Sequence, residues 1–93
     1  MKKLILKVRI LTPKQTIFEG EAVSVSSKNS AGKFDILPQH ANFITLVQKD
    51  PIIVVQSVVQ KDSHPKPLIF NFPTAIIYAS SDSVNIYTEL PLK

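Results

Sequence analysis

The sequence predicts an all-β fold, a sandwich or barrel, on three observations. Apolar residues recur with a period of two, which is the period of a β-strand rather than that of a helix. No segment offers a convincing helix, and the chain holds 7 prolines and many β-branched residues. About eight or nine short segments follow one another at spacings of roughly 8–12 residues, which is typical of all-β sandwiches and barrels. With no repeat and no linker, residues 1–93 are expected to form a single domain.

The first half of the chain is expected to contain four short strands. The first places four aliphatic residues on one face: Leu4, Leu6, Val8 and Ile10. A turn at 12–15 leads into a return segment at 16–18, which Gly20 is expected to end. Residues 22–27 alternate again, with Val23 and Val25 expected to point inward. A polar loop at 28–32, with a glycine near its end, leads to a strand at 33–37, as in a hairpin.

The second half repeats this alternation after a break at 38–41. Strands are expected at 42–47, 52–55, 68–72, 75–79 and 84–88, separated by turns at 48–51, 73–74 and 80–82. The segment at 52–55 is apolar on both faces and is extended by Val58 and Val59, so it is expected to be covered on both sides or to run along a partner. Residues 61–67 are expected to form a hairpin loop and 90–93 a tail.

Composition excludes several classes of protein. The chain has no cysteine, which excludes disulfides, thiol catalysis and cysteine–zinc sites. No apolar run approaches the roughly 18 residues of a membrane helix. The apolar stretch near the N-terminus is too short for a secretory signal. Hydrophobic residues make up 44% of the chain and charged residues 19%, close to globular averages. These values indicate a soluble intracellular domain.

The charge leaves two functional classes open. Eleven Lys and Arg residues against 7 Asp and Glu give a net charge of +4, spread along the chain. The excess fits either a solvated surface or a basic all-β domain that binds nucleic acid. Several aromatic residues could then stack on bases: Phe34, Phe43, Phe70, Phe72, Tyr78 and Tyr87. A structural or adaptor sandwich is a further alternative.

The residues offer little for catalysis. His40 and His64 have no nearby partners with metal-ligand spacing. No serine occupies a nucleophile-elbow context, and two glycines, Gly20 and Gly32, do not make a phosphate-cradling loop. We therefore expect no catalytic residues, cofactor or metal site.

Three segments carry a resemblance to a known family. They are residues 6–13 (Leu-Lys-Val-Arg-Ile-Leu-Thr-Pro), residues 18–22 (Phe-Glu-Gly-Glu-Ala) followed by Val25, and residues 32–41 (Gly-Lys-Phe-Asp-Ile-Leu-Pro-Gln-His-Ala). In order and spacing they resemble the N-terminal domain of the epsilon subunit of F-type ATP synthase. Residues 84–87 (Val-Asn-Ile-Tyr) are similar to its final strand.

The resemblance implies a flattened sandwich of two sheets with roughly five strands each. It also implies a non-catalytic rotor subunit of the central stalk, which binds the gamma subunit and the c-ring and couples ion translocation to ATP synthesis. Its place would be peripheral, on the cytoplasmic face of the bacterial plasma membrane, or on the matrix or stromal side in an organelle. The family usually continues into a two-helix C-terminal domain, so a chain ending at Lys93 is expected not to impose helical inhibition.

The resemblance also assigns candidate contact residues. The implied gamma-facing residues are Thr12, Ala41, Phe43 and Ile44. The implied c-ring-facing residues are Asn29, Ser30, Ala31, Gly32, Lys33, Pro38, Gln39 and His40. Some positions depart from the family pattern: Lys33 stands where an acidic residue is common, Gln39 and Asp35 where glycine is common, and Thr74-Ala75 where two glycines are expected.

Overall fold

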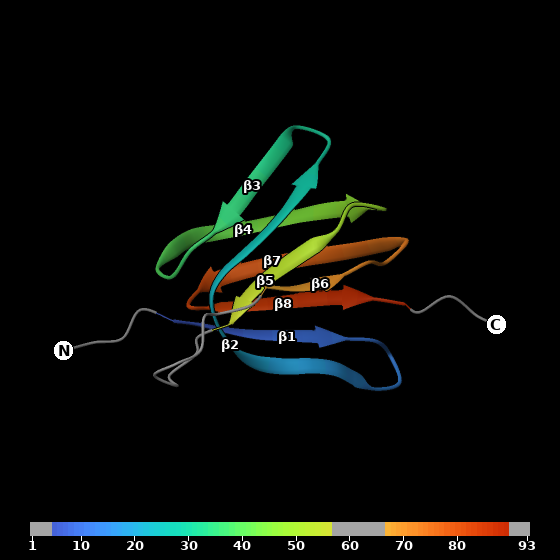
Figure 1. Ribbon diagram of the computed structural model, residues 1–93, viewed down its shortest axis with the longest axis horizontal. Coiled ribbons are helices and arrows are strands. Elements are labelled where there is room, and N and C mark those ends of the chain that lie inside the picture. Colours follow the sequence, from blue (N-terminus) through green and yellow to red (C-terminus); the bar gives the residue numbers. More distant parts are fainter. Residues whose placement is uncertain (1–4, 57–66, 90–93) are drawn as a thin grey trace.

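The computed structural model describes residues 5–56 and 67–89, and the regular secondary structure of this part is entirely strand (Figure 1). The strands are β1 (Leu6–Leu11), β2 (Thr16–Asn29), β3 (Gly32–Ile36), β4 (His40–Gln48), β5 (Ile52–Gln56), β6 (Pro67–Phe70), β7 (Thr74–Ser81) and β8 (Ser83–Thr88). The predicted all-β class is therefore confirmed. The predictions for Leu4, Val58, Val59, His64 and the tail at 90–93 lie outside the described residues.

The strands form one curled sheet that folds over into two layers. The first layer runs in the order β4, β7, β8, β1 and the first half of β2, and the second contains β3, the second half of β2, β5 and β6. Neighbouring strands are antiparallel except β1 and β8, which are parallel. The long strand β2 belongs to both layers and passes behind β1 in Figure 1 before rising toward β3.

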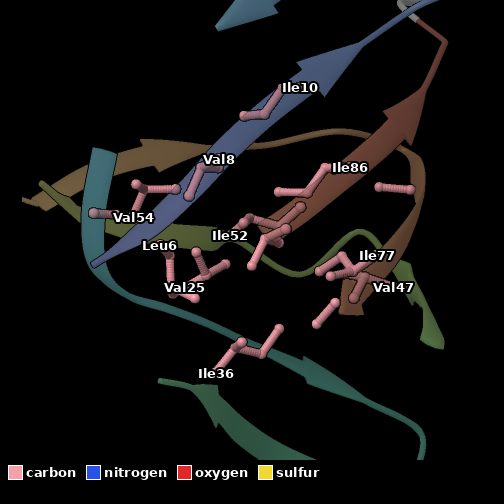
Figure 2. Packing of buried hydrophobic residues seen from close by; sticks show 14 of the residues in the cluster. Leu6, Val8, Ile10, Val25, Ile36, Val47, Ile52, Val54, Ile77 and Ile86 are labelled. Carbon is pink, nitrogen blue, oxygen red and sulfur yellow. The ribbon is translucent and has the colours of Figure 1, made fainter. Parts of the chain in front are cut away.

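The core lies between the two layers. In β1, Leu6, Val8 and Ile10 are buried while Lys7 and Arg9 are exposed, as the period of two predicts. Figure 2 shows these side chains pointing toward aliphatic residues of β5, β7 and β8. Other members of this cluster include Val25, Ile36, Val47, Ile52, Val54, Ile77, Val84 and Ile86. Each such side chain contributes roughly 1.5–3 kcal/mol when fully buried, so the aliphatic core dominates the folding free energy.

A bulge in β2 changes which of its residues face the core. Ala22 and Val25 are both buried although they are three positions apart, which in a regular strand would place them on opposite faces, and the pairing with β5 shifts between Ala22 and Ser24. An extra residue in one strand reverses the alternation beyond it. Val23 is consequently 39% exposed. The predicted inward position of Val23 is wrong, whereas that of Val25 is confirmed.

Gly20 does not end a strand as the sequence predicted, because β2 continues through it and pairs Gly20 with Val8. The ring of Phe18 lies over the glycine: a Cβ added to Gly20 would lie 3.0 Å from Phe18 Cζ. Phe18 in turn packs against Phe70, with 5.5 Å between ring centroids. An aromatic side chain that covers a glycine on a neighbouring position compensates for the missing side chain.

Candidate functional site

An exposed apolar patch covers the outer face of the first layer. It consists of Ile44 and Leu46 on β4, Ile76 and Tyr78 on β7, and Tyr87 on β8, which we call the β4–β7–β8 patch. These five are among eight large hydrophobic side chains that are exposed in the described part of the chain. They lie at outward positions of strands whose inward positions fill the core, so each of these strands carries apolar side chains on both faces.

Strand register makes this patch continuous. Ile44 pairs with Tyr78, Leu46 with Ile76, and Ile76 with Tyr87 across the next pair of strands. Directly opposed residues on antiparallel strands have their Cβ atoms about 4.5–5.5 Å apart, so their side chains touch. Contiguous exposed apolar patches with polar rims mark interaction sites in soluble proteins.

Charged residues lie beside the patch, on β1 and β2. Arg9 is opposite Glu19, with 4.0 Å between Arg9 Nε and Glu19 Oε2, and Lys7 is opposite Glu21. All four side chains are exposed. An apolar centre with a charged margin is the usual anatomy of a protein–protein interface, and it supplies binding rather than chemistry.

The structure separates the four residues that were predicted to face gamma. Ile44 points outward and is 67% exposed, on the β4 side of the patch. Phe43, the next residue, points inward against the core, with its ring centroid 5.3 Å from that of Phe34. Thr12 lies beyond the end of β1, and Ala41 near the start of β4, at the opposite end of the first layer. Of the four, Ile44 is thus the one whose side chain the structure places in the patch.

Thr12 has a local structural role. Its Oγ1 accepts hydrogen bonds from the main-chain N–H groups of Lys14 (3.2 Å) and Gln15 (3.0 Å), and it lies 3.1 Å from the carbonyl oxygen of Gln15, to which it donates. A threonine used in this way closes a turn. The side chain therefore shapes the connection between β1 and β2.

The residues predicted to face the c-ring form two separate turns. Asn29, Ser30, Ala31, Gly32 and Lys33 make the tip of the β2–β3 hairpin. Within it, Asn29 Oδ1 accepts the Ala31 N–H at 2.9 Å, and Asn29 Nδ2 donates to Thr45 Oγ1 of β4 at 2.8 Å. The first hydrogen bond closes the tip on itself, and the second joins it to the first layer.

Pro38, Gln39 and His40 follow the other end of β3, so the strand's length separates them from the hairpin tip. Gln39 has a φ of 65°, and its main-chain N–H donates to Asp82 Oδ1 at 2.9 Å. The outward residues Lys33, Asp35 and Leu37 are exposed and connect the two turns along the edge of the second layer. Both turns lie on the β3 edge of the second layer, but at opposite ends of that strand.

Sequence reasoning missed most of the patch, namely Leu46, Ile76, Tyr78 and Tyr87. A signal was available in the run Ala75–Ala79, in which every residue is apolar. Such a run cannot be an ordinary strand with one solvated face, so it indicates either full burial or an exposed apolar surface.

The arrangement of aromatic rings disfavours the nucleic-acid alternative. Phe34, Phe43, Phe70 and Phe72 all pack into or against the core, which leaves Tyr78 and Tyr87 as the exposed rings of that set. Base stacking requires exposed rings within a positively charged groove. Here Tyr78 stands opposite Ile44 and Tyr87 opposite Ile76, within the apolar patch.

The described part of the chain holds neither a metal-ligand cluster nor a membrane-spanning helix. Residues 5–56 and 67–89 contain no group of three or more His, Asp or Glu side chains placed to hold a metal ion. The same part of the chain contains no helix with the length and hydropathy of a membrane span.

Comparison with known proteins gives one family. The family described as ATP synthase, Delta/Epsilon chain, beta-sandwich domain matches residues 5–89. An ATP synthase epsilon chain from Sulfurimonas denitrificans is 33% identical over 67 residues, which cover 72% of this chain and 48% of that protein. One from Protochlamydia amoebophila is 27% identical over 86 residues, covering 92% of this chain and 54% of that protein. This chain spans about half the length of these relatives.

Solved structures share the fold at low sequence identity. A chain in the Euglena gracilis mitochondrial ATP synthase has a TM-score of 0.77 at 10% identity, covering 92% of this chain and 51% of that one. A chain in the central stalk and c-ring structure of the Tetrahymena thermophila mitochondrial ATP synthase has a TM-score of 0.68 at 14% identity, covering 96% and 66%. At these identities the likeness establishes the β-sandwich fold.

Proposed function

The chain belongs to the β-sandwich family of ATP synthase delta and epsilon chains, and we propose that it is a non-catalytic rotor subunit of the central stalk. In this role it binds the gamma subunit and the c-ring and helps couple ion translocation to ATP synthesis. It performs no chemistry itself, and it needs no cofactor.

The observation that carries the proposal is the β4–β7–β8 patch. A subunit that turns together with gamma needs a contact that persists through each rotation. An apolar patch of aliphatic and tyrosine side chains supports such a contact, because burial of apolar area is the main favourable term in protein association. Tyrosine also contributes large area at low entropic cost, and its hydroxyl can form a hydrogen bond at the rim. We therefore assign the patch, which includes Ile44 and Tyr78, to gamma.

The second contact uses the edge of the second layer. The β2–β3 hairpin tip, Asn29–Lys33, and the turn at Pro38–His40 flank the exposed side of β3. Their side chains are mostly small or polar, which suits a limited contact with short polar loops of the c-ring. The protein then sits at the membrane surface through the complex, on the cytoplasmic face in a bacterium or the matrix or stromal side in an organelle.

Charge placement in the patch tests the gamma contact. Ile44→Asp puts a carboxylate within the patch, opposite Tyr78, and Ile69→Asp is its matched control. Ile69 lies on β6 of the second layer and is 59% exposed against 67% for Ile44. Both variants should fold, because neither side chain belongs to the core. Calorimetric titration with purified gamma should show affinity reduced at least about tenfold for Ile44→Asp, because the contact would bury a carboxylate without a partner.

The outcomes separate the assignments. Ile69→Asp should bind gamma as the unmodified chain does. Equal loss in both variants would point to a general effect of added charge, and equal retention would place the gamma contact elsewhere on the molecule. Failure of the unmodified chain to bind gamma would overturn the proposed function itself.

A further inference from the structure

Two lysines oppose each other in the β2–β3 hairpin. Lys28 and Lys33 are direct cross-strand partners, and both are exposed. Residues directly opposite on antiparallel strands place their side chains on the same face, where like charges are destabilising. The hairpin therefore holds an arrangement that is unfavourable in the isolated chain.

Elsewhere on its strands the chain avoids this arrangement. The described strands carry four lysine or arginine residues, of which two are Lys28 and Lys33. The remaining two, Lys7 and Arg9, stand opposite Glu21 and Glu19. At the hairpin no internal acid takes this role. The ion pairs found within residues 5–56 and 67–89 do not include Lys28 or Lys33.

The nearest carboxylate along β3 already has a partner. Asp35 Oδ1 accepts a hydrogen bond from Ser26 Oγ, its cross-strand neighbour, at 2.5 Å. The Asp35 carboxylate is therefore bound to a side chain of β2, within the hairpin itself. The side chains of Lys28 and Lys33 are exposed on the same face.

The tip that carries these lysines is held in one conformation. Gly32 adopts a φ of 123°, which L residues rarely take, and Asn29 ties the tip both to Ala31 and to Thr45 of β4. A surface that is ordered before binding loses less entropy on association. The hairpin thus presents a preformed pair of positive charges.

We propose that the β2–β3 hairpin docks on a polypeptide loop that carries at least one carboxylate, contacted by Lys28 and Lys33. The inference rests on the proposed function, in which this tip meets the c-ring, and it specifies the chemistry of the ring loop as acidic. Two lysines are far fewer than the 6–10 phosphate contacts of a strongly bound nucleic acid. Asp35 beside them would also repel a surface of phosphates, whereas a loop of mixed polar groups accommodates it.

A zero-length cross-link tests the contact directly. A carbodiimide joins a lysine amine to a carboxylate only when the two are in contact, so it should be applied to ATP synthase purified from the source organism. Tryptic mass spectrometry should find peptides that join Lys28 or Lys33 to an Asp or Glu of the ring subunit. In enzyme carrying Lys28→Gln and Lys33→Gln these peptides should disappear, while cross-links within the rest of the rotor persist.

Charge reversal then measures the strength of the contact. The double variant Lys28→Glu, Lys33→Glu should bind the detergent-solubilised ring about tenfold more weakly or worse, because two exposed ion pairs, each worth up to about fivefold, become repulsive. Lys14→Glu reverses the charge of an exposed lysine in the β1–β2 turn; it is the control for charge reversal away from the hairpin and should bind as the unmodified chain does.

Three results would overturn the inference. Ring cross-links from other lysines but none from these two would do so, as would unchanged ring affinity in the double variant. Retention on anionic vesicles without the ring, lost in the same variant, would replace the loop with a lipid surface. Absence of the chain from the purified enzyme would instead overturn the proposed function, so the two failures can be told apart.

Discussion

The side-chain carboxylate of Asp82 accepts a hydrogen bond from the main-chain N–H of Gln39, with 2.9 Å between the nitrogen and Oδ1. Asp82 lies in the turn between β7 and β8, and Gln39 in the turn that precedes β4. The carbonyl oxygen of Asp82 also accepts the N–H of Lys7 at 2.8 Å. One turn residue thus fixes the entry of β4 and the start of β1, which lie at the same end of the first layer.

Removal of this carboxylate should lower stability. Asp82→Ala leaves the Gln39 N–H without its acceptor, and we expect the free energy of unfolding to fall by about 1 kcal/mol, since the site is exposed and water replaces the carboxylate in part. Asp82→Asn keeps an acceptor oxygen and should recover most of the loss. Urea denaturation measures both, and an Asp82→Ala variant as stable as the unmodified chain would contradict the role given to this contact.

A glycine at position 39 should raise stability. Gln39 has a φ of 65°, in the left-handed region, which costs a residue with a Cβ roughly 1–2 kcal/mol. Part of that gain is offset by the greater freedom of glycine in the unfolded chain. Gln39→Gly should therefore increase the free energy of unfolding by about 0.5–1 kcal/mol.

The control for that substitution lies on the next strand. Gln48 is exposed at the end of β4 and is not among the residues with positive φ. Gln48→Gly should lower stability by about 0.5–1 kcal/mol, the ordinary cost of glycine in a strand. If Gln39→Gly lowered the free energy of unfolding as Gln48→Gly does, position 39 would hold no backbone strain for glycine to relieve.

Replacing Gly32 with a residue that has a Cβ should lower the free energy of unfolding through backbone strain alone. Its φ of 123° is one that L residues rarely adopt, and an added Cβ would have no atom within 4 Å, so no steric clash contributes. Gly32→Ala should cost about 1–3 kcal/mol, the range for a strained backbone conformation. Thermal unfolding followed by circular dichroism measures the loss, and a neutral result would show that the hairpin can change its turn without penalty.

Much of this fold follows from local patterns. The alternation of β1 and β8 predicts their buried faces, because polar or charged residues alternate with the core residues in each strand. In β1 these outward residues are Lys7 and Arg9, and in β8 the outward residue between Val84 and Ile86 is Asn85. One solvated face leaves a single assignment of inside and outside.

Other features are beyond local patterns for physical reasons. The segment Ala22–Val25 alternates in the sequence, but a bulge forms where β2 leaves β1 for β5, and only the pairing of distant strands determines that place. The apolar run Ala75–Ala79 has no polar residue to distinguish its faces, so the exposed position of Ile76 and Tyr78 depends on which layer covers β7. The hydrogen bond between Gln39 and Asp82 joins residues that only the complete topology brings together.

Phe43 and Ile44 should respond in opposite ways to truncation. Phe43 packs inward against Phe34, and Phe43→Ala removes a ring from that contact. We expect a loss of about 2 kcal/mol in the free energy of unfolding, below the 3–5 kcal/mol of a fully buried ring because Phe43 is only half buried. Ile44→Ala should change stability by less than about 0.5 kcal/mol, as for other surface positions.

Binding to gamma should reverse that order, because Ile44 is exposed in the patch while Phe43 faces the core. Calorimetric titration of gamma with each folded variant makes the comparison. A Phe43→Ala variant of undiminished stability that has lost gamma affinity would assign the contact to Phe43 rather than to the patch.

Salt should distinguish the two proposed contacts. Apolar burial is not screened by ions, so the affinity of the β4–β7–β8 patch for gamma should vary less than about twofold between 50 and 500 mM NaCl. Contacts between exposed charges weaken as the Debye length shortens, so ring association through Lys28 and Lys33 should weaken severalfold over the same range.

A control at the margin of the patch is the double variant Arg9→Gln, Glu19→Gln, which removes the 4.0 Å pair without changing net charge. It should leave gamma affinity within about twofold, as expected of an exposed pair. If gamma affinity instead fell steeply with salt and with this double variant, the charged margin on β1 and β2 would carry the contact, and the apolar patch would need another occupant.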